Sequence, residues 1–169
     1  MFLDFVREKM NASEKELAKS AFLIINEVMG TIHAGRVILV FAEKKPDIFQ
    51  SKYTKYFFQI GEGAIYLALS KFMDLWDCQI GILLLKDCLP GRGEKLLKDL
   101  KKKKIREFRN LFVAHYADRK NAPKTSLETL ERLIKAQGFK SATEIAIWTK
   151  GILEDLEYVR NCLQNKYDL

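Results

Sequence analysis

A stripe of apolar and small residues that advances by three or four positions runs through the first quarter of the sequence. Its members are Leu17, Ala21, Ile24, Val28, Ile32, Gly35, Leu39 and Ala42. These steps follow the 3.6-residue period of an amphipathic α-helix, and Pro46 cannot continue such a helix. The segment Val37–Ala42 taken alone would suit a strand, but the stripe passes through it. The pattern therefore predicts one long helix that begins at Ser13, where Ser13 and Glu16 form a capping box.

Helical periodicity continues to the end of the chain, and no repeat or linker interrupts it. The expected later elements are a helix around residues 58–76, a short apolar element at 80–89, a basic helix from about Glu94 to a break at 121–123, a short helix at 127–137, and a last helix opened by the capping box of Ser141 and Glu144. Nine glycines and three prolines are too few for a β-sandwich, a barrel or a low-complexity tail. We therefore expect residues 1–169 to form a single domain, an all-α antiparallel helical bundle.

Composition favours a soluble, cytoplasmic domain that does not bind a membrane. The longest unbroken apolar runs span six residues, and the N-terminal segment carries acids rather than the basic leader of a signal peptide. Three cysteines, an odd number with no C-x-x-C pair, predict buried reduced thiols rather than disulfides. With two histidines and no spaced cluster of acids to join them, we expect no metal site and no cofactor.

The positive charge of the chain is concentrated in one segment. Most of the net charge of +7 lies between Lys95 and Arg109, a segment that contains eight Lys and Arg residues but only two Asp and Glu residues. Such a run is typical of a solvated helix face, but a concentrated run also attracts phosphate groups. The candidate RNA-binding residues are Lys101, Lys102, Lys103, Lys104 and Arg106. Trp76 and Trp148 belong to apolar stripes and are expected to pack in the core rather than stack on bases.

Three residues at the end of this run suit a metal-free ribonuclease: Arg109, Asn110 and His115. Such an enzyme needs a base for the 2′-hydroxyl, a cation for the charge that develops on the phosphoryl oxygens, and an acid for the leaving 5′-oxygen. Histidine titrates near neutral pH and suits the base or the acid. Arginine presents a fork of N–H donors that matches phosphate. Asn110 would orient one of these groups or the scissile phosphate.

The spacing of Arg109 and His115 indicates that a second subunit completes the site. Six residues of an ideal helix give a rise of about 9 Å and a rotation of about 240°, so the two side chains do not share a face. A two-fold dimer would bring the same segment of each chain together and supply two histidines, one as base and one as acid. An interrupted helix or a swing of the arginine side chain are the alternatives.

The segment around these residues resembles the signature of HEPN domains, in which an arginine is followed, after four to six residues, by a histidine. Here the signature reads Arg109-Asn110-x-x-x-x-His115, ends in Val-Ala-His and has Asp118 three residues later. Within that superfamily the chain is most similar to the abortive-infection U-type HEPN proteins of bacteria, loosely over most of residues 50–160. The resemblance implies a helical bundle and a homodimer with both motifs at its interface. It also implies metal-independent RNA cleavage by Arg109 and His115, with Asn110 assisting.

The resemblance further implies a toxin of a phage-defence or toxin–antitoxin system, with an antitoxin protein as partner. Family members neutralised by a nucleotidyltransferase typically carry a tyrosine two residues after the histidine, whereas this chain has Ala117 there and its tyrosine at Tyr116. Two other interpretations fit the same residues. One is a non-catalytic HEPN-like module that binds RNA or protein through the basic run. The other is a helical scaffold in which the histidine is structural and Arg109 pairs with Glu107 or Asp118.

Overall fold

The computed structural model describes residues 2–44, 51–78, 85–110, 138–139 and 141–169, with side chains from Glu14 onward in the first helix and from Phe57 onward in the second. Every regular element within those residues is a helix, which confirms the predicted all-α class. The elements are α1 (Phe2–Lys44), α2 (Ser51–Asp77), α3 (Lys86–Cys88), α4 (Arg92–Lys102) and α7 (Ala142–Tyr167). Residues 105–110 are also helical.

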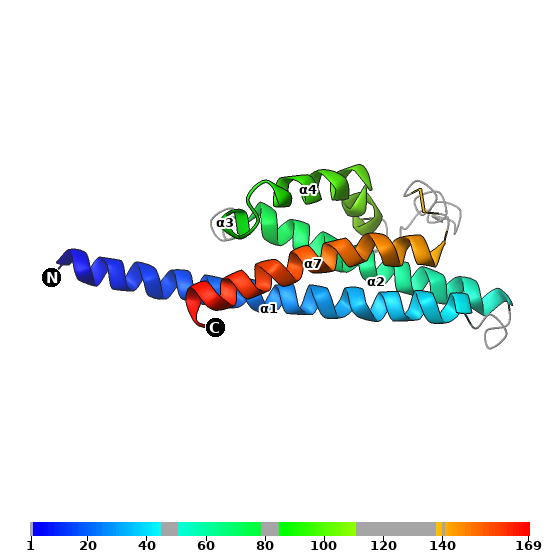
Figure 1. Ribbon diagram of the computed structural model, residues 1–169, viewed down its shortest axis with the longest axis horizontal. Helices are drawn as coiled ribbons and strands as arrows, with labels where there is room; N and C mark the ends of the chain where they lie inside the picture. Colours follow the sequence, from blue (N-terminus) through cyan, green and yellow to red (C-terminus); the bar gives the residue numbers. More distant parts are fainter. Residues whose placement is uncertain (1, 45–50, 79–84, 111–137, 140) are drawn as a thin grey trace, which may run out of the picture.

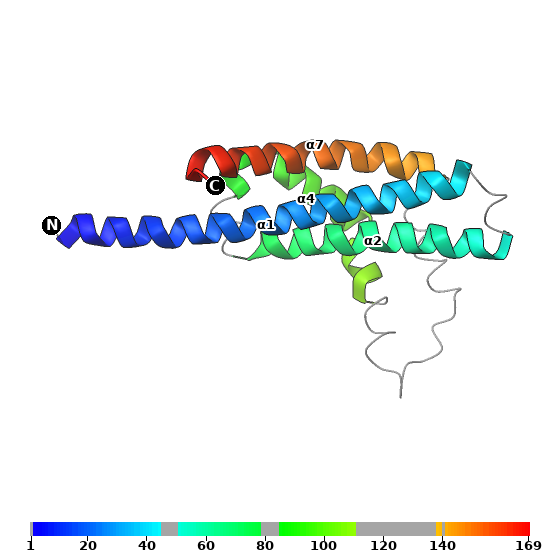
Figure 2. The same cartoon turned by 90° about the horizontal axis from the view of Figure 1, so that it is seen from below.

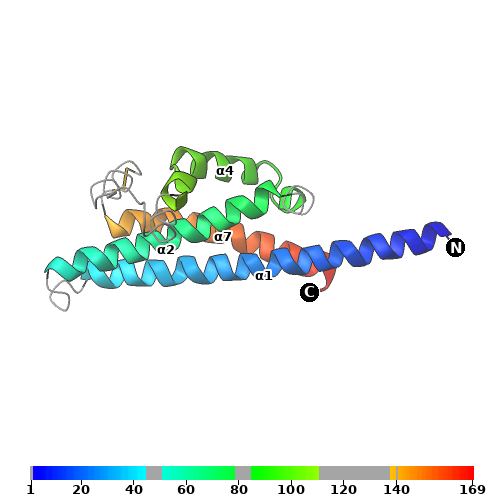
Figure 3. The same cartoon turned by 180° about the vertical axis from the view of Figure 1, so that it is seen from behind.

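The long helix α1 lies between α2 and α7 (Figure 2) and runs antiparallel to both (Figure 1). Its N-terminal turns extend past the ends of the other helices. The fourth helix of the bundle, α4, runs antiparallel to α2 (Figure 3). It is held on two sides, because Gly93 lies against Trp76 of α2 and Asp99 accepts a hydrogen bond from Trp148 of α7. This packing places the segment that follows α4 beside α2.

The predicted apolar stripe of α1 faces the core. Its members Ala21, Val28, Ile32, Leu39 and Ala42 are almost completely buried. At Gly35 the two longest helices meet through their backbones, because a Cβ atom on Gly35 would lie 2.7 Å from the carbonyl oxygen of Gly61. Glycine at both positions removes the side chains that would otherwise separate α1 from α2.

The expected start of the first helix at Ser13 is wrong. Helix α1 begins at Phe2 and passes through Ser13 without interruption. No glycine or proline lies between Phe2 and Ser13, and serine inside a helix costs only about 0.5 kcal/mol relative to alanine. A serine and a glutamate three residues apart are therefore compatible with a helix interior as well as with a helix start.

The second capping box is confirmed. Ser141 has extended backbone angles, with φ −151° and ψ 160°, and its hydroxyl accepts a hydrogen bond of 3.2 Å from the backbone N–H of Glu144. The expected inner face of α7 is also largely correct, since Ile145, Ile152 and Leu156 are buried. The backbone is extended at Ser141, whereas at Ser13 it remains within α1.

The basic helix that the sequence predicts as continuous is divided in two. Helix α4 ends at Lys102, Lys103 and Lys104 form a turn, and helical geometry resumes at Ile105. Lys104 has φ 54°, in the left-handed region. A straight helix would separate Leu100 from Ile105 by about 140° around its axis. The turn allows both residues to be fully buried, so core packing selects the break.

The tryptophans and cysteines behave as structural residues. Trp76 is buried and packs on Phe72, with ring centroids 6.1 Å apart, which supports the expectation of a core role. All three cysteines are free thiols, but the expected burial holds only for Cys88, since Cys78 and Cys162 are half-buried. Burial, followed by a hydrogen bond with Cys162, raises the pKa of the Cys88 thiol to about 12, so Cys88 stays protonated at neutral pH. Cys78 donates a hydrogen bond to the carbonyl oxygen of Leu75.

One described stretch, Glu14–Lys44 of α1, is long and apolar enough to cross a membrane, with a mean hydropathy of 1.4 in its most apolar 18-residue window. The sequence-based expectation of no such stretch rested on the length of unbroken apolar runs. In α1 these runs are short because polar residues on its other face interrupt them. A helix of a protein core can pass the same test of length and composition, and 33% of the window is buried within the bundle. Ile25, Ile32 and Leu39 belong to the common core that α1 forms with its neighbours.

Candidate functional site

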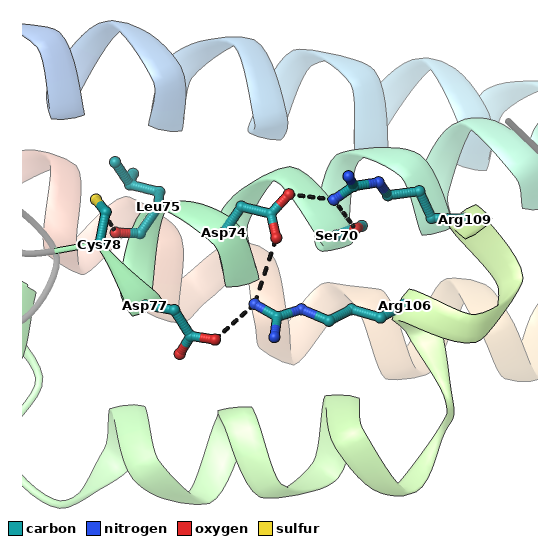
Figure 4. Close-up of polar contacts among 7 residues, drawn as sticks. All are labelled: Ser70, Asp74, Leu75, Asp77, Cys78, Arg106 and Arg109. Carbon is teal, nitrogen blue, oxygen red and sulfur yellow. Dashed lines mark hydrogen bonds and ion pairs between the residues drawn. The ribbon is translucent and has the colours of Figure 1, made fainter.

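Arg109 lies in the helical segment 105–110 and reaches across to α2. Its Nη1 atom donates a hydrogen bond of 3.4 Å to Oγ of Ser70, which is fully buried, and a second to the carboxylate of Asp74 (Figure 4). The arginine side chain is 39% exposed. The guanidinium is therefore anchored on one side by α2 and open to solvent on another.

Arg106 lies one turn earlier on the same segment and contacts the same carboxylate. Its Nη2 atom is 3.3 Å from Oδ1 of Asp74 and 2.6 Å from Oδ2 of Asp77. Asp74 thus pairs with two arginines, one through each oxygen. We call Arg106, Arg109, Asp74 and Asp77 the arginine–aspartate cluster (Figure 4).

Two local features bring this cluster together. On α2, Ser70, Asp74 and Asp77 are spaced by four and three residues and so lie on one face of the helix. On the facing segment, Phe108 is buried and its ring meets that of Tyr66 edge-on, with centroids 4.7 Å apart. The buried phenylalanine fixes the segment against α2, and the arginines on either side of it reach the acids.

The acids of the cluster are absent from the sequence-based candidates. The sequence offered Glu107 or Asp118 as partners of Arg109, but the partner is Asp74, while Glu107 lies 3.5 Å from Lys104 and Asp118 is outside the described residues. The available signal was the spacing of the polar residues at positions 70, 74 and 77, which places them on one face of the helix. That pattern indicates a polar face on the helix but not which residues contact it.

The predicted catalytic residues are placed only in part. Asn110 is exposed and directly follows Arg109 at the end of the described helical segment. His115 is outside the described residues. Arg109 and Asn110 are therefore the two members of the predicted motif whose surroundings the structure defines, and the catalytic assignment of all three stays a prediction.

The cations of the basic run have different environments. Lys101 and Lys102 are exposed in the last turn of α4. Lys104, in the left-handed turn, pairs with Glu107 across 3.5 Å. Arg106 is held by the arginine–aspartate cluster. Lys101 and Lys102, like Lys95 and Lys98 earlier in α4, are exposed and therefore suit phosphate contacts.

Lys103 has a different environment from its neighbours. Its Nζ atom is 4.0 Å from the centroid of the Phe139 ring and 5.8 Å from that of Trp148, within the range of cation–π contacts. The two rings are themselves 5.0 Å apart, and Trp148 Nε1 donates a hydrogen bond of 2.8 Å to Asp99. Lys103 therefore contributes to packing between α4 and α7, rather than acting only as a solvated cation.

A line of polar side chains runs along α2 at intervals of four residues: Glu62, Tyr66, Ser70 and Asp74. The first three are buried. Burial raises the pKa of the Glu62 carboxyl to about 7, and burial together with the charge of Glu62 raises the pKa of the Tyr66 phenol. The Tyr66 hydroxyl is also buried and has no hydrogen-bond partner among the described residues. Glu62 and Tyr66 are not among the sequence-based candidates, and their only signal in the sequence is the four-residue spacing that leads to Asp74.

Charge in the cluster is balanced, since two arginines face two aspartates. Their side chains are between 38% and 46% exposed, and exposed ion pairs of this kind contribute at most about 1 kcal/mol each to stability. The main consequence of the cluster is therefore geometric. It holds two guanidinium groups in defined places at the surface.

Comparison of the chain with protein-family models, with curated proteins and with solved structures found no match. Among the described residues, no group of three or more His, Cys, Asp and Glu side chains is arranged to hold a metal ion.

Proposed function

We propose that this protein is a metal-independent, HEPN-like endoribonuclease of a bacterial defence or toxin–antitoxin system. The proposal assigns catalysis to Arg109 and His115, with Asn110 orienting a reacting group. One observation carries it: the guanidinium of Arg109 is anchored through Nη1 to Ser70 and Asp74, yet the side chain remains 39% exposed. An arginine held in this way, directly before Asn110 and six residues before His115, suits a fixed phosphate-binding group.

In the proposed reaction the 2′-hydroxyl oxygen attacks the adjacent phosphorus, and the bond to the leaving 5′-oxygen breaks. A histidine acting as base takes the 2′-hydroxyl proton, and a histidine acting as acid protonates the leaving oxygen. The guanidinium of Arg109 neutralises the charge that develops on the phosphoryl oxygens. The products are a 2′,3′-cyclic phosphate and a free 5′-hydroxyl.

The proposal includes a homodimer, because one His115 cannot be base and acid in the same step. Two copies related by a two-fold axis would supply both histidines. Sedimentation at micromolar concentration should therefore give the mass of two chains. A monomer under those conditions would contradict the shared site.

We place the protein in the cytoplasm, where an RNA-cleaving toxin meets its substrate, and propose an antitoxin protein as its partner. Because Ala117 stands where family members modified by a nucleotidyltransferase carry tyrosine, the partner is expected to act by another route. Purification of the protein together with its operon neighbours, followed by an activity assay of the complex, tests this part.

The decisive experiment measures RNA cleavage in EDTA by the wild type, Arg109→Ala, His115→Ala and His33→Ala. The last variant is a matched control, because His33 is the only other histidine and lies exposed on α1. We expect cleavage with 2′,3′-cyclic ends by the wild type and His33→Ala, and its loss in the other two. Cleavage that survives both Arg109→Ala and His115→Ala would overturn the assignment.

A second candidate function is a HEPN-like module that binds RNA or protein without cleavage. The observation in its favour is the balanced charge of the arginine–aspartate cluster, which leaves the exposed lysines of α4 (Lys95, Lys98, Lys101 and Lys102) as cations of the basic run outside that cluster. A strongly salt-dependent affinity for RNA in the absence of any cleavage would favour this function.

A further inference from the structure

Asp74 occupies a singular place in the arginine–aspartate cluster, because it alone contacts both arginines. Oδ1 faces Nη2 of Arg106 at 3.3 Å, and Oδ2 accepts a hydrogen bond from Nη1 of Arg109. We propose that Asp74, assisted by Ser70, is a positioning residue that fixes the guanidinium of Arg109 with its Nε–Nη2 edge directed to the phosphodiester group of an RNA substrate. This inference rests on the proposed function for the identity of the substrate.

The donor inventory of Arg109 supports this orientation. A guanidinium carries five N–H donors, two on each terminal nitrogen and one on Nε. Ser70 and Asp74 both accept from Nη1, which uses the two donors of that nitrogen. The Nε–Nη2 edge makes no hydrogen bond with a described residue, and this edge matches two phosphate oxygens in the bidentate geometry typical of arginine.

The burial of Ser70 adds rigidity to the arrangement. Ser70 is 0% exposed, so its hydroxyl cannot follow a moving guanidinium, while Asp74 holds the same nitrogen from one turn further along α2. Two acceptors on one nitrogen, both from a single helix, restrict rotation of the guanidinium plane more than one surface ion pair would. Phe108, buried beside Arg109, restrains the backbone at the same point.

Asp77 is the natural control for this role. It has nearly the same exposure as Asp74, 45% against 46%, and the same charge, but it contacts Arg106 and not Arg109. A purely electrostatic effect of a carboxylate near the site would be similar for both acids. A positioning effect on Arg109 belongs to Asp74 alone.

The kinetic test compares Asp74→Asn with Asp77→Asn. We expect Asp74→Asn to lower kcat by at least about tenfold with KM changed less than about threefold, because misplacement of a catalytic group acts mainly on the transition state. Asp77→Asn should leave kcat within about threefold of wild type. Equal losses in the two variants would overturn the positioning role, as would an unchanged kcat in Asp74→Asn with its helicity and melting temperature retained.

A second readout does not depend on catalysis. Rotation of the Arg109 guanidinium is measured by NMR at the side-chain Nε–H group, with Arg109→Lys used to assign the signal. We expect slow rotation in the wild type and in Asp77→Asn, and faster rotation in Asp74→Asn. Equal mobility in all three proteins would overturn the proposal.

The two readouts separate this inference from the proposed function. Absence of RNA cleavage by the wild type, together with rotation that depends on Asp74, would defeat the ribonuclease and keep the positioning of Arg109. Cleavage that requires Arg109 but does not depend on Asp74 would keep the ribonuclease and defeat the positioning.

Discussion

Gly93 in the first turn of α4 lies directly against the indole ring of Trp76 near the end of α2. A Cβ atom added to Gly93 would come within 2.0 Å of the Cη2 atom of the indole, far inside van der Waals contact. Both residues are buried, and Trp76 immediately precedes Asp77 of the arginine–aspartate cluster. The absence of a side chain at position 93 therefore sets how closely α4 approaches α2.

Gly93→Ala should destabilise the protein by about 1–3 kcal/mol, because the added methyl group displaces a rigid indole or moves α4. Unfolding in guanidinium chloride measures the change. Gly151→Ala is the control, since a Cβ atom at Gly151 meets nothing within 4 Å and alanine favours the helix by about 0.5–1 kcal/mol. Similar effects of the two substitutions would contradict the close contact.

Glu62→Gln should remove a pH-dependent loss of stability. The pKa of Glu62 is raised by burial from 4.5 to about 7, so between those pH values the folded protein binds more protons than the unfolded chain. Stability due to this group therefore falls as the pH rises from about 4.5 to about 7 and is constant above that range, with a total of about 3 kcal/mol.

Denaturant unfolding of wild type and Glu62→Gln at pH 5 and pH 8 measures this difference. Other titrating groups contribute equally to both proteins and cancel in the comparison. We expect the stability of Glu62→Gln relative to wild type to increase between the two pH values. A difference that does not change with pH would show that Glu62 is solvated in the folded protein.

Lys104→Gly should stabilise the protein by about 0.5–1 kcal/mol. Lys104 has φ 54°, a conformation that costs a residue with a side chain more than it costs glycine. The exposed pair that Lys104 forms with Glu107 contributes little to stability. Thermal unfolding measures the gain, and Lys98→Gly within α4 should instead lose about 1 kcal/mol. Destabilisation by Lys104→Gly would indicate that the helix continues through this position.

Replacement of Lys101 and Lys102 by glutamine should weaken binding to single-stranded RNA and reduce its salt dependence. Loss of two phosphate contacts lowers the slope of log affinity against log salt by about 1.4. Fluorescence anisotropy in the His115→Ala background, which we expect not to cleave RNA, measures the affinity at each salt concentration. The exposed pair Lys15 and Lys19 on α1 carries the same charge and serves as control. Equal effects of the two double variants would show that net charge, and not the end of α4, determines binding.

The helical fold could be predicted because apolar spacing of three and four residues persists over long segments. The stripe of α1 and the inner face of α7 were identified correctly from Leu39 and Ile152 and their neighbours, which are buried as expected. Short capping motifs in the sequence were less informative about where a helix begins. Ser141 and Ser13 begin the same short motif, yet only Ser141 starts a helix: its backbone is extended, whereas Ser13 lies inside a helix that begins at Phe2.

Only the arginine motif of the candidate site, and not the acids that contact it, could be predicted from the sequence. The spacing of Arg109 and Asn110 is local and visible in the sequence, whereas the contact between Arg109 and Asp74 joins residues 35 positions apart. That contact depends on the turn at Lys104, which arises because the core accepts both Leu100 and Ile105. Tertiary packing of this kind overrides helical periodicity, so the acids that hold the arginine could not be deduced from spacing alone.

The turn at Lys103 and Lys104 also makes the number of lysines in the run as important as their charge. The four lysines at positions 101–104 look interchangeable in the sequence, but each residue of a helix advances the next by about 100° around its axis. A fifth lysine inserted in the helical part, at Lys101 or Lys102, would add one charge and turn the residues that follow by about 100° around the helix axis, away from the position in which Arg109 meets Asp74. The number of residues between α4 and the helical segment 105–110 is therefore constrained by the packing of both on α2, more tightly than the identity of those residues.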